Sequence, residues 1–174
     1  MLRVGVVGFG YWGPNVVRNF NSLNDVRVEV ICDQEAAARR RAESLYPKTR
    51  IMSNVNDVVV SPSLDIVAIA TPVFTHFEFA KKALLNGKHV FVEKPFARTV
   101  SQAETLIHFA EKKRLKIMVD HTFIFTGAVK KIKEVIEKQQ LGKLYYYDST
   151  RVNLGLFQHD VNVAWDLATH DLYI

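Results

Sequence analysis

Short runs of β-branched residues alternate with segments of helical period along most of this chain. Such alternation is typical of successive strand–helix units, which build a parallel sheet with helices on both of its faces. The pattern therefore predicts an α/β fold, with a doubly wound parallel sheet formed by residues 1–120. We expect strands at Leu2–Val7, Arg27–Cys32, Arg50–Met52, Ile66–Ala70, His89–Val92 and Ile117–Val119.

Three local signals predict where helices begin or end. Pro14 lies near the start of the first helix, where its missing N–H leaves no helical hydrogen bond unmade. Ser101 is predicted to cap a helix that runs to about Lys113. Asn86-Gly87 predicts the end of the preceding helix, because glycine favours the conformation found at helix C-termini.

The pattern changes after the sixth predicted strand. A helix is expected over Gly127–Gln140, then a turn at Leu141-Gly142, and then one strand over the alternating run Lys143–Asn153. A further helix is expected to begin near Trp165. A single strand cannot bury its own faces. We therefore expect residues 121–174 to be the incomplete start of a second domain that the natural protein continues.

Composition excludes several other classes of protein. Hydrophobic residues make up 48% and charged residues 24%, which is typical of a globular chain with an apolar core. The net charge of +5 comes from scattered Lys and Arg rather than from a basic tract with interleaved aromatics, so no nucleic-acid partner is expected. No window approaches the roughly 20 apolar residues of a membrane span, so no membrane partner is expected.

The single cysteine, Cys32, excludes an internal disulfide and a metal cage built from cysteines. Glycines interrupt the apolar run at the N-terminus, so this run predicts a strand rather than a signal peptide. A cytoplasmic location is the simplest expectation.

A glycine-rich turn, Gly8-Phe9-Gly10-Tyr11-Trp12-Gly13, lies directly between the first strand and the first helix. It matches G-x-G-x-x-G, in which glycines permit a tight turn and let backbone N–H groups approach a pyrophosphate. The N-terminus of the helix adds a favourable dipole. Such a motif can also be only a turn, but its place in the first strand–helix unit favours dinucleotide binding.

Asp33 ends the second strand about 20 residues after Gly13, as in dinucleotide-binding folds. A carboxylate there would accept hydrogen bonds from the adenosine ribose and repel a 2′-phosphate, which predicts NAD rather than NADP. The alternative is a cap for a helix over Glu35–Leu45. The arginines at 39–41 could meet a phosphate, but a solvated helix face is the preferred interpretation.

Two further segments follow predicted strands, where a doubly wound sheet binds its ligands. Thr71-Pro72 could line the nicotinamide half of a cofactor or simply form a loop, and His76 on the next helix is equally compatible with a structural or a functional role. In Glu93-Lys94-Pro95, Lys94 could bond a substrate hydroxyl and act as an acid or base. A lone lysine at a strand end is usually solvated, so its role depends on its neighbours.

Asp166 and His170 are four residues apart, hence on one face of the last predicted helix. A carboxylate there can orient the imidazole, which could accept a proton from an alcohol. The alternative is an ordinary helix with Asp166 as its N-cap. No third metal ligand is evident, so no metal is predicted. His121, after the sixth strand, could touch substrate or cofactor or make an interdomain hydrogen bond.

Five segments together resemble the glucose-fructose oxidoreductase, inositol dehydrogenase and rhizopine-catabolism (Gfo/Idh/MocA) family over the whole chain. They are Gly8–Gly13, Cys32-Asp33, Ala70-Thr71-Pro72, Glu93-Lys94-Pro95, and Trp165-Asp166 with His170-Asp171.

The resemblance implies a Rossmann domain at residues 1–120 that binds NAD, and a second α+β domain with a large, mostly antiparallel sheet that begins in residues 121–174. It implies that Lys94, Asp166 and His170 are catalytic. The expected cofactor-binding residues are Gly8, Phe9, Gly10, Tyr11, Trp12, Gly13, Asp33, Thr71, Pro72, His76, Glu93 and Lys94.

Within the family, residues 153–163 resemble the dehydrogenases that oxidise the 3-hydroxyl of UDP-N-acetylglucosamine or its uronic acid. The resemblance implies an NAD-dependent dehydrogenase of a nucleotide-linked sugar, which forms a homo-oligomer through its second sheet. Alternatives are inositol or a free sugar as substrate, a non-catalytic NAD-binding sensor or assembly subunit, and an inactive fragment. The expected substrate-binding residues are Lys94, His121, Arg151, Asn153, Asp166 and His170.

Overall fold

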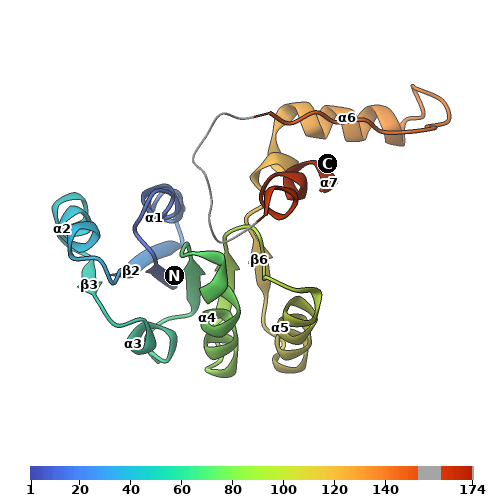
Figure 1. Cartoon of the computed structure of the whole chain (residues 1–174). Helices are drawn as coiled ribbons and strands as arrows, with labels where there is room; N and C mark the ends of the chain where they lie inside the picture. Colours follow the sequence, from blue (N-terminus) through green and yellow to red (C-terminus); the bar gives the residue numbers. More distant parts are fainter. Residues whose placement is uncertain (153–161, 174) are drawn as a thin grey trace. The chain divides into compact units, whose positions relative to one another are not determined.

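The computed structural model describes residues 1–152 and 162–173 (Figure 1). The chain forms two compact units, Met1–Val119 and Asp120–Ile174. They are called the first and second units below. Within the described ranges, no helix combines the length and the apolar character needed to cross a membrane.

The first unit is built on a six-stranded sheet in the order β3-β2-β1-β4-β5-β6, and every pairing is parallel. The predicted α/β fold is confirmed, and its strands differ from prediction by at most one residue at an end. Because β1 lies between β2 and β4, the chain changes its direction of winding there. The strands are β1 (Leu2–Val7), β2 (Val26–Cys32), β3 (Arg50–Met52), β4 (Ile66–Ile69), β5 (His89–Val92) and β6 (Ile117–Val119).

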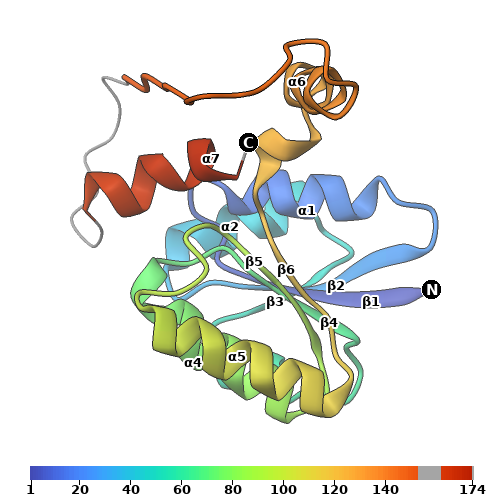
Figure 2. The same ribbon diagram turned by 90° about the vertical axis from the view of Figure 1, so that its right-hand side faces the viewer.

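Helices cover both faces of this sheet, and each face has its own buried cluster. Helices α1 (Gly13–Asn21) and α2 (Ala36–Leu45) lie on one face, and α4 (Val73–Leu85) and α5 (Val100–Lys113) on the other (Figure 2). The short helix α3 (Val55–Val59) contributes to the buried cluster on the face that α4 and α5 cover. Successive strand residues point to opposite faces, so a parallel sheet covered in this way needs apolar residues at nearly every strand position.

Two of the three predicted helix signals are confirmed. Pro14 occupies the first turn of α1, and α4 ends at Leu85 with Gly87 at a φ of +74°. The prediction for Ser101 is wrong. The residue that caps α5 is Thr99, whose extended backbone lets its side chain accept a hydrogen bond of 3.2 Å from the Gln102 N–H.

The second unit contains a 3-10 turn, η1 (Thr122–Phe125), and helix α6 (Gly127–Glu137), which ends three residues before the predicted limit. The predicted helix near Trp165 is present as a π-helical turn, η2 (Ala164–Ala168), followed by α7 (Thr169–Leu172). The strand predicted over 143–153 is wrong for its described part, because residues 143–152 form no strand. A strand needs a partner for its backbone hydrogen bonds, and none of the described strands lies beside this run.

An ion pair joins the start of β1 to the residue before β4. The Arg3 guanidinium donates to both carboxylate oxygens of Asp65, at 3.0 and 2.9 Å, and the Arg3 backbone N–H donates to the same group at 2.8 Å. These hydrogen bonds lower the pKa of Asp65 to about 2 from an ordinary 3.8. The carboxylate therefore stabilises the fold above pH 4, and this stabilisation is lost as the pH falls towards 2.

We predict that Arg3→Met reduces the loss of stability between pH 4 and pH 2, because the Asp65 pKa returns towards its ordinary value. Urea unfolding at a series of pH values measures this effect. Arg27→Met is the matched control, since Arg27 lies in an exposed pair with Glu29 on β2. If Arg3→Met and the native protein lose stability equally over this range, the Arg3–Asp65 pair is not its cause.

Candidate functional site

The carboxyl ends of four neighbouring strands carry the predicted cofactor residues of the first unit. Asp33 follows β2, the glycine turn at 8–13 follows β1, Thr71-Pro72 follows β4, and Glu93-Lys94 follows β5. Since these strands are parallel and adjacent, the four segments lie along one edge of the sheet. Ligands of doubly wound sheets bind at this edge, beside the strand where the winding reverses.

Two of the three glycines in the turn are required by the fold itself. Gly8 has a φ of +96°, and a Cβ there would overlap the backbone carbonyl of Ala70. A Cβ on Gly13 would overlap the carbonyl oxygen of Gly8. The backbones of β1, the segment after β4 and the start of α1 therefore approach too closely for any side chain.

Gly10 is different, because the protein alone does not require a glycine at this position. It is not among the described glycines with a positive φ, and a Cβ there would meet no described atom within 4 Å. The turn therefore leaves open space at Gly10, which a pyrophosphate needs in order to reach the backbone. The first turn of α1 carries no acidic residue, so the positive end of its dipole remains available to an anion. These residues fit a dinucleotide.

Asp33 ties the end of β2 to the glycine turn. One carboxylate oxygen accepts a hydrogen bond of 2.6 Å from the Phe9 N–H, and the other accepts one of 2.8 Å from the Glu35 N–H. The cap position of α2 is Glu35, so the alternative interpretation of Asp33 as the N-cap is wrong.

Two arginines of α2 donate to backbone carbonyls at this edge, a role that the prediction of a solvated face did not include, although Arg41 is exposed as predicted. Arg39 donates to the carbonyl oxygens of Asp33 and Gln34, at 3.0 and 2.6 Å. Arg41 donates to the carbonyl oxygen of Phe9 and, at 2.7 Å, to that of Gly10. Sequence reasoning missed this role because no local pattern shows where a long side chain on the next helix will reach.

His76 joins the loops that follow β4 and β5. Its side chain is 1% exposed, its Nε2 lies 2.7 Å from the carbonyl oxygen of Thr71, and its Nδ1 lies 2.9 Å from that of Pro95. This buried bridge connects the Thr71-Pro72 segment to the one that carries Lys94. Lys94 itself is half-buried at the carboxyl end of β5, and the peptide bond to Pro95 is cis.

A second group of predicted residues gathers within the second unit. The His170 ring contacts Phe123 edge to face, with centroids 4.8 Å apart. The Arg151 guanidinium lies over the Phe123 ring, 4.7 Å from its centroid. Arg151 also donates two hydrogen bonds, of 2.9 and 2.8 Å, to the Asp171 carboxylate. This bond lowers the pKa of the Asp171 carboxyl. Arg151 therefore braces the helix that carries His170.

Asp166 and His170 lie in one continuous helical segment, as predicted, but Asp166 is in its π-helical turn. The alternative of Asp166 as an N-cap is wrong, because the Asn162 side chain accepts the hydrogen bond from the Trp165 N–H at 2.9 Å. Asn153, predicted to contact substrate, lies outside the described residues.

His121 is 8% exposed and stacks on Tyr173, with ring centroids 3.6 Å apart. In the described part of the chain, neither of its ring nitrogens has a hydrogen-bond partner. Burial lowers the pKa of His121, an effect that the charge of Asp120 opposes. Across residues 1–152 and 162–173, no three His, Cys, Asp or Glu side chains gather closely enough to hold a metal ion.

We predict that Gly10→Ala and Gly13→Ala separate binding from folding. Gly10→Ala leaves the free energy of unfolding within about 0.5 kcal/mol of the native value, because its methyl group enters open space. The same methyl group blocks the approach of a pyrophosphate, so NAD affinity falls at least about tenfold. Gly13→Ala overlaps the backbone and costs about 2 kcal/mol or more. Calorimetric titration and urea unfolding measure the two effects, and native NAD affinity in Gly10→Ala would contradict the assignment.

Comparisons with known proteins agree with this geometry. The profile of an oxidoreductase family with an NAD-binding Rossmann fold matches residues 2–121. An uncharacterized oxidoreductase of Streptococcus pneumoniae is 29% identical over 165 residues, which are 95% of this chain and 44% of that protein. The chain thus spans less than half the length of this relative.

Two solved structures share the fold. Biliverdin reductase from Synechocystis, in complex with biliverdin and NADP+, has a TM-score of 0.73 at 26% identity, covering 79% of this chain and 43% of that one. Scyllo-inositol dehydrogenase from Lactobacillus casei, with bound NAD(H) and scyllo-inositol, has a TM-score of 0.76 at 22% identity, covering 82% and 42%. With its glycine turn at the reversal of the sheet and a family match over most of its length, the chain belongs to the Gfo/Idh/MocA oxidoreductase family and carries that family's NAD-binding Rossmann fold.

Proposed function

We propose that this chain is the cofactor-binding part of an NAD-dependent dehydrogenase that oxidises a secondary hydroxyl of a sugar. The observation that carries the proposal is the open face of Gly10 beside Asp33, on the same sheet edge as Lys94. This edge offers backbone N–H groups for a pyrophosphate, a carboxylate for a ribose and a cation for a reacting oxygen.

The residues at this edge divide the cofactor between them. The glycine turn and the N-terminus of α1 would bind the pyrophosphate, because both present N–H groups and a positive dipole. Asp33 would bind the adenosine ribose hydroxyls. Thr71-Pro72 and Glu93-Lys94 would lie beside the nicotinamide half, with His76 fixing these two segments to each other. When bound, NAD supplies a hydride acceptor.

Three side chains of this chain would act on the substrate hydroxyl. Lys94 polarises its oxygen, His170 accepts its proton, and Asp166 orients His170. The contact with Phe123 supports this assignment of His170, because Phe123 contacts both the imidazole and Arg151 and so restrains the position of the ring. Arg151 is predicted from the sequence to bind substrate. In this proposal it instead holds the helix that carries His170, through its hydrogen bonds to Asp171.

The finer substrate proposal is a nucleotide-linked sugar, oxidised at the 3-hydroxyl of a UDP-N-acetylhexosamine or its uronic acid. Its support is the resemblance of residues 153–163 to that subgroup, and inositol or a free sugar is the alternative. We also propose a homo-oligomer assembled through the second unit, whose Tyr145, Tyr146 and Tyr147 are exposed. A single buried cysteine, Cys32, favours a cytoplasmic setting.

We predict that Lys94→Met and His170→Asn each reduce sugar-dependent NADH formation by the full-length protein at least about 100-fold, the range typical of a lost acid–base group. NAD affinity should remain within a few-fold of native in His170→Asn. Lys112→Met and His108→Asn are matched controls at exposed positions of α5, and they should leave turnover unchanged.

Several outcomes would contradict the proposal. Native turnover in Lys94→Met or His170→Asn would remove those residues from the mechanism. NAD binding without turnover on UDP-sugars, free sugars or inositols would favour the alternative of a non-catalytic NAD-binding protein.

We predict that Asp33→Asn shifts coenzyme preference towards NADP. The amide can still accept the hydrogen bond from the Phe9 N–H, but it no longer repels a 2′-phosphate, and the guanidinium of Arg39 lies nearby. The ratio of NAD to NADP affinity should fall at least about tenfold, equivalent to about 1.4 kcal/mol. Calorimetric titration with both coenzymes measures it, and an unchanged ratio would show that Asp33 does not select the coenzyme.

A further inference from the structure

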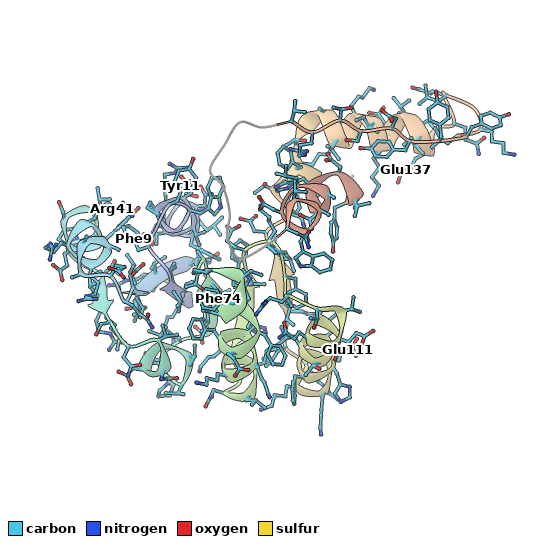
Figure 3. The ribbon with its side chains drawn as sticks, viewed as in Figure 1. Phe9, Tyr11, Arg41, Phe74, Glu111 and Glu137 are labelled. Carbon is cyan, nitrogen blue, oxygen red and sulfur yellow. The ribbon has the colours of Figure 1, made fainter. Side chains whose placement is uncertain are left out.

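Arg41 holds the glycine turn from outside the motif. Its guanidinium donates to the carbonyl oxygens of Phe9 and Gly10, two consecutive residues, and lies 5.3 Å from the centroid of the Phe9 ring. The Phe9 ring is fully buried, so the surface on which the guanidinium packs is held in place. Figure 3 labels both side chains, which lie side by side although they are far apart in the sequence.

These two hydrogen bonds fix the direction of two backbone N–H groups. A trans peptide unit is planar, so its C=O and its N–H point in opposite directions. When Arg41 holds the Phe9 carbonyl, the N–H of Gly10 must point away from the guanidinium, and when it holds the Gly10 carbonyl, the N–H of Tyr11 must do the same. Both N–H groups belong to the stretch of backbone that Gly10 leaves open.

A second contact restrains the same stretch. The Asp33 carboxylate accepts the Phe9 N–H at 2.6 Å, so the peptide units on both sides of Phe9 are held, one by Asp33 after β2 and the other by Arg41 on α2. Of the two, Arg41 is the residue that sets the direction of the Gly10 and Tyr11 N–H groups. Both hydrogen bonds come from one guanidinium nitrogen, Nη2, whose two hydrogens point in fixed directions within the guanidinium plane, whereas the hydrogens of a lysine ammonium rotate freely.

We propose that Arg41 is a positioning residue for the pyrophosphate of the dinucleotide, which fixes the N–H groups of Gly10 and Tyr11 before the ligand arrives. The proposal rests on NAD binding at the glycine turn. In this proposal, the glycine turn supplies the backbone N–H groups that bind the pyrophosphate, and Arg41 on α2 holds them in place. Preorganised donors bind more tightly because less freedom is lost on binding.

The test compares Arg41→Met with Arg40→Met in the full chain without ligand. Arg40 is an exposed neighbour on the same helix, so its removal changes the charge equally. Hydrogen exchange at the Phe9 amide, which donates to Asp33 within the same turn, should accelerate at least about tenfold in Arg41→Met, because the turn opens more easily without the hydrogen bonds from Arg41. It should remain native in Arg40→Met. Arg41→Lys should also exchange faster, because it keeps the charge without the fixed directions of the two guanidinium hydrogens.

Binding of NAD, ADP-ribose and adenosine provides the second measurement. Arg41→Met should weaken NAD and ADP-ribose at least about tenfold, as expected for lost charge-assisted hydrogen bonds, and leave adenosine unchanged. If exchange stays native while adenosine also weakens, Arg41 contacts the ligand directly and the positioning role is wrong. Equal effects in Arg40→Met would also overturn it. If Arg41→Met fails to fold, Arg41→Lys gives the same comparison.

The two proposals fail differently. Absence of NAD binding in the native protein contradicts the proposed function. Native exchange at the Phe9 amide in the Arg41 variants contradicts only the positioning role, because exchange is measured without a ligand.

Discussion

The backbone contact between the glycine turn and the segment after β4 is the constraint on which the site depends. Gly8 lies against the Ala70 carbonyl, and Gly13 lies against Gly8, with no room for a Cβ at either position. This contact exists because β1 and β4 are neighbours in the sheet. It brings the start of α1 to the point where the winding reverses, so the helix N-terminus and the open face of Gly10 share one edge with Lys94.

Side chains outside the glycine motif keep this edge rigid. Beside β2, Asp33 and Arg41 hold the turn by its N–H and its carbonyls. On the opposite side, buried His76 joins the loops after β4 and β5. Loops at a sheet edge are otherwise the mobile parts of a fold. A site that binds a dinucleotide benefits from such bracing, because flexible donors must be ordered at the expense of affinity.

In the second unit, the local sequence specifies the helices but not the predicted strand. Residues 143–152 alternate as a strand should, yet they form none among the described residues, and Tyr145 and Tyr146 are more than 80% exposed. The helix that carries His170 is nonetheless formed, and contacts from Arg151 to Asp171 and from Phe123 to His170 support it. Helices satisfy their backbones internally, whereas strands depend on neighbours.

The sequence by itself determined the six strands, the glycine turn and the order in which the candidate residues follow the strands, because periodicity and glycine chemistry are local. It also indicated the family through Glu93-Lys94-Pro95. Only the tertiary structure decided that Gly8 and Gly13 serve packing while Gly10 faces open space, that Thr99 rather than Ser101 caps α5, and that Arg41 reaches the turn. The Thr99 cap depends on the local backbone conformation, whereas the roles of the glycines and of Arg41 depend on which segments approach each other, and contacts between distant segments leave no signal in the spacing of residues.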